Sequence, residues 1–251
     1  REYFERAIAE DPGYALAHIG LGNYFLHLAY FGFQRPREAL ARAHELASKA
    51  LEIDDGLALG HAFLGMLRAT DYDWPGAQRA FRRALELDRQ TVEIWPGYDW
   101  YWLIPMRRLD EALAVSQRAL EQDPLSAFAQ WLLGYRHYLR RQFDLAIRQC
   151  RNALELDPNY LPAHAFLGEA LLQQGKPDQA VQALEKAVAL SRRSPFTLGE
   201  LGFVCAVAGQ TTQARRLLAE LEGLASRGNV PPSSFGRIYL GLGEIERAFE
   251  W

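Results

Sequence analysis

Residues 167–187 read LGEALLQQGKPDQAVQALEKA, and the features of this segment recur through the C-terminal half of the chain. Its first glycine, Gly168, belongs to a column at Gly134, Gly168, Gly202 and Gly236, in which each residue follows the last by 34 positions. Two further columns keep the same interval, at Ala146, Ala180, Ala214 and Ala248, and at Leu133, Leu167, Leu201 and Phe235. A fixed period of this size is typical of a solenoid of stacked units, each too small to bury its own apolar face.

Each unit reads as two amphipathic helices joined by a turn. In one unit, apolar residues at helical spacing fill 128–141, and a second such series fills 143–154. The second helix is expected to end at Asp157-Pro158, because proline cannot continue a helix and restricts the residue before it. A left-handed cap residue is expected after the first helix, where three units carry Gly175, Gly209 and Gly243.

This pattern of Leu-Gly, turn glycine, small alanine and closing Asp-Pro resembles the tetratricopeptide repeat, which has a 34-residue period. The resemblance covers essentially the whole chain and is most complete at 167–187. It implies an all-α, right-handed superhelical solenoid of helix-turn-helix units that binds proteins, and it says little about catalysis. The chain is also similar to the C-terminal arrays of bacterial signalling proteins, where a winged-helix regulator, cyclase or serine/threonine kinase domain lies upstream.

We predict a single array over 1–251 whose outer units are truncated, so that both ends are expected to be cut from a longer protein. The first full unit carries an insertion, in which Pro36 opens a long second helix that runs to about Ile53. The loop before it holds Phe31 and Phe33, which either pack on the array or contact a partner. The expected units are 1–12, 14–55, 57–90, 92–124, 125–158, 159–192, 194–228 and 229–251.

The unit over 92–124 departs from the pattern, because Trp100 stands in the glycine column. Trp95 and other aromatic residues surround it, and Pro105 is expected to end this helix where other units carry a glycine cap. A tryptophan cannot be packed into a glycine-sized contact without moving the helices. We therefore expect a different local geometry here, with the regular register restored at Ala112.

Composition and charge exclude several classes of function. The 251 residues are 49% hydrophobic and 24% charged, with a net charge of −3, which is too small to favour nucleic acid. No apolar run is long enough to predict a membrane span. Cys150 and Cys205 fall on core columns of different units, which predicts free buried thiols and favours the cytoplasm, with the periplasm as the alternative.

No constellation in the sequence predicts an enzyme, a metal site or a cofactor. His18, His61 and His164 each precede a column glycine by four residues, so they occupy one framework position in different units and cannot converge on a metal. Carboxylates such as Asp54 and Asp157 stand at turns or helix ends, where they are expected to cap the backbone. Phosphate-binding loops and nucleophile motifs are absent from the sequence.

The aromatic residues suggest a binding surface. Phe128, Trp131, Tyr135 and Tyr138 are spaced three, four and three apart, so they share one face of a first helix. The family resemblance implies that first helices line the concave groove and that the residue after the glycine column points into it. The candidate groove residues are therefore Asn23, Met66, Tyr101, Phe128, Trp131, Tyr135, Tyr138, Glu169 and Phe203. The alternative, that these rings pack against neighbouring units, stays open.

A groove of this composition favours an amphipathic helix or an extended apolar peptide as the ligand. It lacks the repeated Lys, Asn and Arg of the carboxylate-clamp members of the family, which disfavours a receptor for chaperone C-terminal tails. We therefore predict a non-catalytic protein-interaction module without cofactor, nucleic acid or membrane as a partner. The alternative is a structural spacer or homodimerisation element for a missing catalytic or DNA-binding domain.

Overall fold

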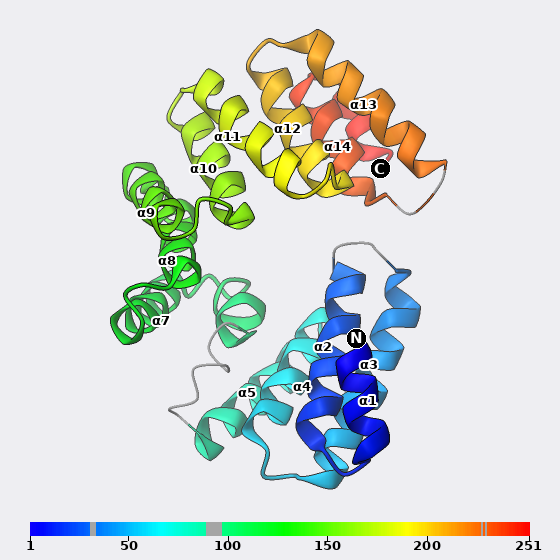
Figure 1. The fold of residues 1–251 in the computed structure, drawn as a ribbon. Coiled ribbons are helices and arrows are strands. Elements are labelled where there is room, and N and C mark those ends of the chain that lie inside the picture. Colours follow the sequence, from blue (N-terminus) through cyan, green and yellow to red (C-terminus); the bar gives the residue numbers. More distant parts are fainter. Residues whose placement is uncertain (31–33, 89–96, 227, 229) are drawn as a thin grey trace. The chain divides into compact units, whose positions relative to one another are not determined.

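The computed structural model of the chain describes residues 1–30, 34–88, 97–226, 228 and 230–251. Within these ranges all regular structure is helical, and the chain divides into two compact units, Arg1–Val115 and Ser116–Trp251 (Figure 1). No described helix is both long and apolar enough to span a lipid bilayer. Phe31, Phe33 and Trp95, which carried sequence predictions, lie outside the described residues.

Unit 1 contains two complete helix pairs that follow a single N-terminal helix. Its elements are α1 (Glu2–Glu10), α2 (Ala15–Tyr30), α3 (Pro36–Ile53), α4 (Ala58–Thr70), α5 (Trp74–Leu87), the π-helix η1 (Asp99–Leu103) and the start of α7 (Leu109–Gln122). The long helix α3 begins at Pro36 and ends at Ile53, as the sequence predicts. Proline is tolerated in the first turn of a helix because backbone N–H groups there have no intrahelical acceptor, so the N–H that proline lacks is not missed.

Unit 2 contains the end of α7 and four helix pairs, each pair joined by a short turn. The pairs are α8 (Ala127–Leu139) with α9 (Phe143–Leu156), α10 (Leu161–Gln173) with α11 (Pro177–Leu190), α12 (Pro195–Val207) with α13 (Thr211–Ala225), and α14 (Pro232–Gly241) with α15 (Ile245–Phe249). The first helices of successive pairs lie against one another, as α12 and α14 show in Figure 1. The predicted helix-turn-helix unit is confirmed. A single array continuous over 1–251 stays a prediction.

Small residues in the glycine column allow close helix contact. A Cβ atom placed on Gly168 would lie 2.7 Å from Cγ of Leu184 and 3.1 Å from the carbonyl oxygen of Ala180, both on α11. Gly202 differs, because such a Cβ would meet Ile238 of the next pair. The column therefore serves contacts both within a pair and between pairs.

The left-handed cap position keeps its geometry across repeats although not always its residue type. Gly175, Gly209 and Gly243 have φ angles of 71°, 79° and 76°, as the sequence predicts. Arg107 and Arg141 occupy the same position in two earlier repeats, with φ angles of 58° and 61°. The helix of the Trp100 unit ends at Leu103, just before Pro105, but the cap position itself is Arg107, so the placement of Pro105 at the cap position is wrong.

The expected change of geometry at Trp100 is confirmed as a π-helical turn. The amide of Ile104 donates to the carbonyl of Asp99 at 3.0 Å, which is the five-residue hydrogen bond of a π-helix. The wider turn places Trp102 and Leu103 in the interior, where they pack with buried Ala112 of α7. The preceding left-handed residue, Tyr72, lies 35 positions before Arg107, one more than the later repeats need.

Candidate functional site

Aromatic rings gather on the first helices of unit 2. Trp131, Tyr135 and Tyr138 of α8 surround Phe166 of α10, with ring centroids 5.7, 4.6 and 6.3 Å from that of Phe166. Trp131 and Tyr135 stack with 8° between their planes, and Phe128 lies 5.7 Å from Trp131. We call these five residues the aromatic cluster. It joins two repeats and leaves part of each ring at the surface.

The aromatic stripe packs on the next repeat and is also partly exposed, so its assignment to a binding groove stays a prediction. Phe166 packs against three of the α8 rings, so the stripe contributes to the contact between neighbouring repeats. Phe128 remains 41% exposed at the start of α8. Burial raises the pKa of the Tyr138 hydroxyl to about 12, with a further contribution from the nearby charge of Glu169. Aromatic packing and solvent exposure thus coexist on one helix face.

Beside the aromatic cluster, three helices contribute a partly buried group of charges. Arg237 of α14 donates from Nη2 to Oε1 of Glu169 on α10 at 2.7 Å, and from Nη1 to Oε1 of Glu200 on α12 at 3.3 Å. The side chains of Arg237, Glu169 and Glu200 are 36%, 16% and 6% exposed. We call these three residues the charge cluster. Tyr138 connects it to the aromatic cluster, because the nearby charge of Glu169 acts on the Tyr138 hydroxyl.

This environment strongly shifts the pKa of the Glu200 carboxyl. Burial and, to a smaller extent, the negative charge of Glu169 raise its pKa to about 8, against the opposing effect of Arg237. Phe203, on the same helix, lies under the Arg237 guanidinium at 5.7 Å from its ring centroid. Tyr138, Glu169 and Phe203, all predicted groove residues, thus meet in one place, and Arg237 is the residue that joins them.

Sequence reasoning missed Glu200 although a signal was available. Glu200 stands two residues before a column glycine, where the other repeats of unit 2 carry Leu132, Phe166 and Ser234. Leu132 and Ser234 are buried and Phe166 is partly buried, so this position faces the interior. A carboxylate at an otherwise apolar or small position could have been found by comparing the repeats.

The three candidate groove residues of unit 1 occupy different surroundings. Met66 and Tyr101 pack against the hydrophobic core of their unit, and burial raises the pKa of the Tyr101 hydroxyl. Asn23 is partly buried, and its backbone carbonyl accepts a hydrogen bond from Nδ1 of His27 at 2.7 Å. A groove that includes these residues together with those of unit 2 stays a prediction.

The framework histidines and the cysteines have structural surroundings. Nε2 of His18, His61 and His164 each contacts the backbone carbonyl six residues earlier, at 3.1, 2.8 and 2.9 Å. The histidine column thus braces the turn before each first helix. Cys150 and Cys205 are free and buried, and burial raises their pKa values to about 12 and 11. No cluster of metal-ligand side chains occurs within the described residues.

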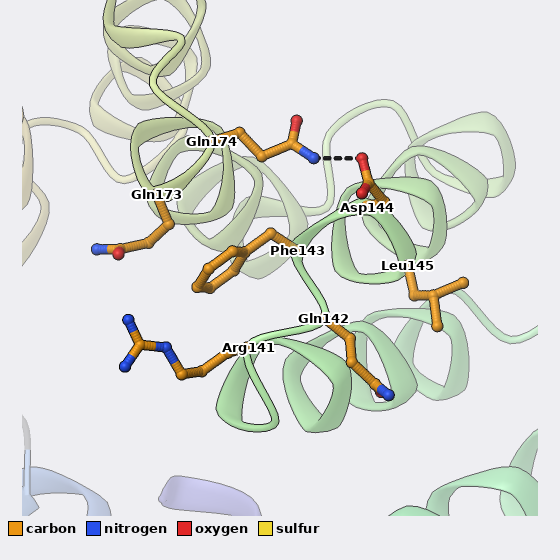
Figure 2. Close-up of a pocket in the computed structure, with 7 residues that line it drawn as sticks. All are labelled: Arg141, Gln142, Phe143, Asp144, Leu145, Gln173 and Gln174. Atoms are coloured by element: carbon orange, nitrogen blue, oxygen red, sulfur yellow. Dashed lines mark hydrogen bonds between the residues drawn. The ribbon is translucent and has the colours of Figure 1, made fainter.

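A shallow depression of about 390 Å³ lies near the turn between α8 and α9. Figure 2 shows that Arg141, Phe143 and Gln173 border it and that Gln174 donates a hydrogen bond to Asp144. The Phe143 ring also contacts Tyr138, with 5.8 Å between centroids. The depression therefore adjoins the aromatic cluster through one ring, and sequence reasoning did not point to it.

Comparison with known proteins identifies the repeats. Two family models, both described as tetratricopeptide repeat, match residues 137–195 and 106–160. The chain is a tetratricopeptide repeat protein. This family forms protein–protein interaction modules that are typically not catalytic, and the all-α fold predicted from the sequence is thus confirmed.

Solved structures of other tetratricopeptide repeat proteins share this fold. The type IV pilus biogenesis factor PilW is 20% identical, with a TM-score of 0.64 over 83% of this chain and 92% of that one. A thermophilic tetratricopeptide repeat protein of Thermus thermophilus is 19% identical, with a TM-score of 0.63 over 74% of this chain and 98% of that one. At these identities the likeness shows the fold alone.

Curated relatives match over a small part of their own length. Superkiller complex protein 3 of Mus musculus is 25% identical over 215 residues, which are 84% of this chain and 13% of that protein. Transcriptional regulator HilA of Salmonella typhimurium is 26% identical over 138 residues, which are 55% of this chain and 25% of that protein. The repeats therefore match only one segment of these larger proteins.

Proposed function

We propose that unit 2 binds an apolar segment of a partner protein, in helical or extended form, on the aromatic cluster. The observation that carries this proposal is the arrangement of partly exposed rings on α8, held in place by Phe166 of the next repeat. Rings fixed by packing lose little conformational freedom when they bind a ligand. Buried aromatic anchors also dominate the binding free energy of many protein interfaces.

The larger context is part of the same proposal. HilA is a transcriptional regulator by name, and the repeats match a quarter of its length. This supports our inference that the module recruits a partner to a larger signalling protein. The array itself, on this proposal, carries no catalytic step.

Selection from a displayed library of random linear peptides tests the binding proposal. We expect the wild-type chain to enrich peptides with aromatic or aliphatic anchors and the Phe128→Asp variant to lose them. Phe128 is the second residue of α8. An aspartate there interacts favourably with the helix dipole, so the variant should remain folded.

Leu16→Asp provides the matched control. Leu16 is the second residue of α2 and is 42% exposed, so position in the helix and exposure match those of Phe128, although it lies in unit 1. The control should retain the enriched peptides. Absence of any enrichment by the wild-type chain would overturn the proposal. Sedimentation of the wild type as a dimer that Phe128→Asp dissociates would instead make this surface a self-association contact.

A further inference from the structure

The charge cluster of unit 2 holds two carboxylates and one guanidinium. Glu169 and Glu200 both approach Arg237, and among the described residues Arg237 is the only cation that forms an ion pair with either carboxylate. Tyr138, which adjoins from α8, has a pKa of about 12 and is neutral at physiological pH. Two carboxylates thus share one guanidinium. Buried charge without a full counterpart is unfavourable, and this raises the pKa of Glu200 above its ordinary value.

A second observation indicates that the chain does not satisfy all polar groups of this region. Ser234 is 2% exposed, and its hydroxyl has no hydrogen-bond partner among the described residues. Its backbone packs directly on Gly199, the neighbour of Glu200, because a Cβ on Gly199 would lie 2.7 Å from Cα of Ser234. Buried hydroxyls without partners are uncommon in folded proteins. The surroundings of Glu200 therefore have unused hydrogen-bonding capacity.

The charge cluster adjoins the surface proposed for binding. Tyr138 belongs to the aromatic cluster, and the nearby charge of Glu169 acts on its hydroxyl, so the two clusters adjoin at these residues. Glu169 and Arg237 are partly exposed, so a ligand on the rings can reach them. Arg237 is already held by two carboxylates, which disfavours an anionic ligand. The charge that complements this region is positive.

We infer that the partner segment carries a lysine or arginine beside its apolar anchor, and that this cation binds against Glu169 and Glu200. The inference rests on the proposed function and names the chemistry of its ligand. The bound cation balances the second carboxylate and takes the place of the proton on Glu200. Binding therefore releases a proton.

The test repeats the peptide selection with the Glu200→Gln variant. Glutamine keeps the size of the side chain and removes its charge. We expect wild type to enrich peptides in which a lysine or arginine accompanies the apolar anchor, and Glu200→Gln to enrich the anchor without the cation. One wild-type-selected peptide and its Lys→Gln or Arg→Gln counterpart are then titrated against both proteins between pH 6.5 and 8.5.

For wild type we expect the cationic peptide to bind about tenfold or more tightly than its counterpart at pH 8.5, as for other charge-assisted contacts. At pH values below the Glu200 pKa, the affinity of the cationic peptide should increase by up to about tenfold for each unit by which the pH is raised, because binding releases one proton. Glu200→Gln should abolish both effects. Selection of apolar peptides without a cation would overturn this inference and leave the proposed function standing. Selection of no peptide would overturn both.

Discussion

Glu169 and Arg237 form an ion pair of 2.7 Å although 68 residues, or two repeat lengths, separate them in the sequence. Each follows a glycine of the same column, Gly168 or Gly236, so the two side chains leave equivalent positions on α10 and α14. The pair passes over α12, which adds Glu200. Three successive repeats are therefore joined by polar contacts as well as by the apolar core.

We expect the Glu200→Gln variant to be more stable than wild type at alkaline pH. The native pKa of Glu200 is about 8 and its ordinary value is 4.5, so between these values the native state binds a proton that the unfolded state lacks. Stability therefore falls as pH rises through this window. At pH 9 the melting temperature of Glu200→Gln should exceed that of wild type by about 3 °C or more, and this difference should disappear near pH 4.5.

The Glu220→Gln variant is the control, because the pKa of Glu220 is shifted in the opposite direction to that of Glu200. Arg193 donates to both oxygens of Glu220 at 2.7 and 2.6 Å and lowers the pKa of that carboxyl. This substitution should destabilise the protein at pH 7, and the difference should disappear as pH falls below the ordinary range of glutamate. Equal pH profiles for the two variants would contradict the electrostatic account of Glu200.

The Gly168→Leu variant should lower the free energy of unfolding by about 2–3 kcal/mol or more, because the added side chain meets Leu184 and the backbone of α11. Urea denaturation measures the change. Gly223→Ala is its control, since a Cβ at Gly223 meets no atom within 4 Å and alanine favours a helix. A Gly168→Leu protein as stable as wild type would show that the proposed close contact is absent.

The Arg141→Gly variant should increase stability by about 0.5–1 kcal/mol. Arg141 is exposed and left-handed, with φ of 61°, a conformation that is unfavourable for every residue with a side chain. The greater freedom of glycine in the unfolded chain offsets part of the gain. Arg140→Gly, at φ −83°, relieves no such strain and should lower the melting temperature. Loss of stability in both variants would contradict the strain argument.

Both thiols should be unreactive in the folded protein. Cys150 and Cys205 are buried, and their pKa values of about 12 and 11 leave little thiolate at pH 8. An aromatic disulfide reagent should label neither under native conditions and both in denaturing urea. Rapid labelling of either residue without urea would show that its repeat opens locally, which the packing of unit 2 does not predict.

Repeat spacing allowed much of the fold to be predicted. Gly175 and its two counterparts mark left-handed caps because glycine favours that conformation, and the caps fix where one helix ends and the next begins. Arg141 could not be recognised as a cap from its residue type. Tertiary packing determines the conformation there, and only the 34-residue interval from Gly175 points to it.

Less of the candidate site could be predicted from the sequence. The stripe from Phe128 to Tyr138 follows from helical spacing, but its packing on Phe166 depends on the angle between repeats, which spacing does not determine. Met66 and Tyr101 were assigned to the groove by position, whereas both pack against the core of unit 1. The π-helical turn near them alters side-chain directions, so position in the repeat is a weaker guide there.

The π-helical turn also has a consequence for how the array accommodates sequence change. The interval from Tyr72 to Arg107 contains one residue more than the interval from Arg107 to Arg141, and η1 lies within it. One extra residue in a regular α-helix rotates every later side chain by about 100° around the axis. A single wide turn absorbs such an insertion where it occurs. The later helices then keep their phase, so a one-residue insertion need not be matched by compensating changes in the repeats that follow.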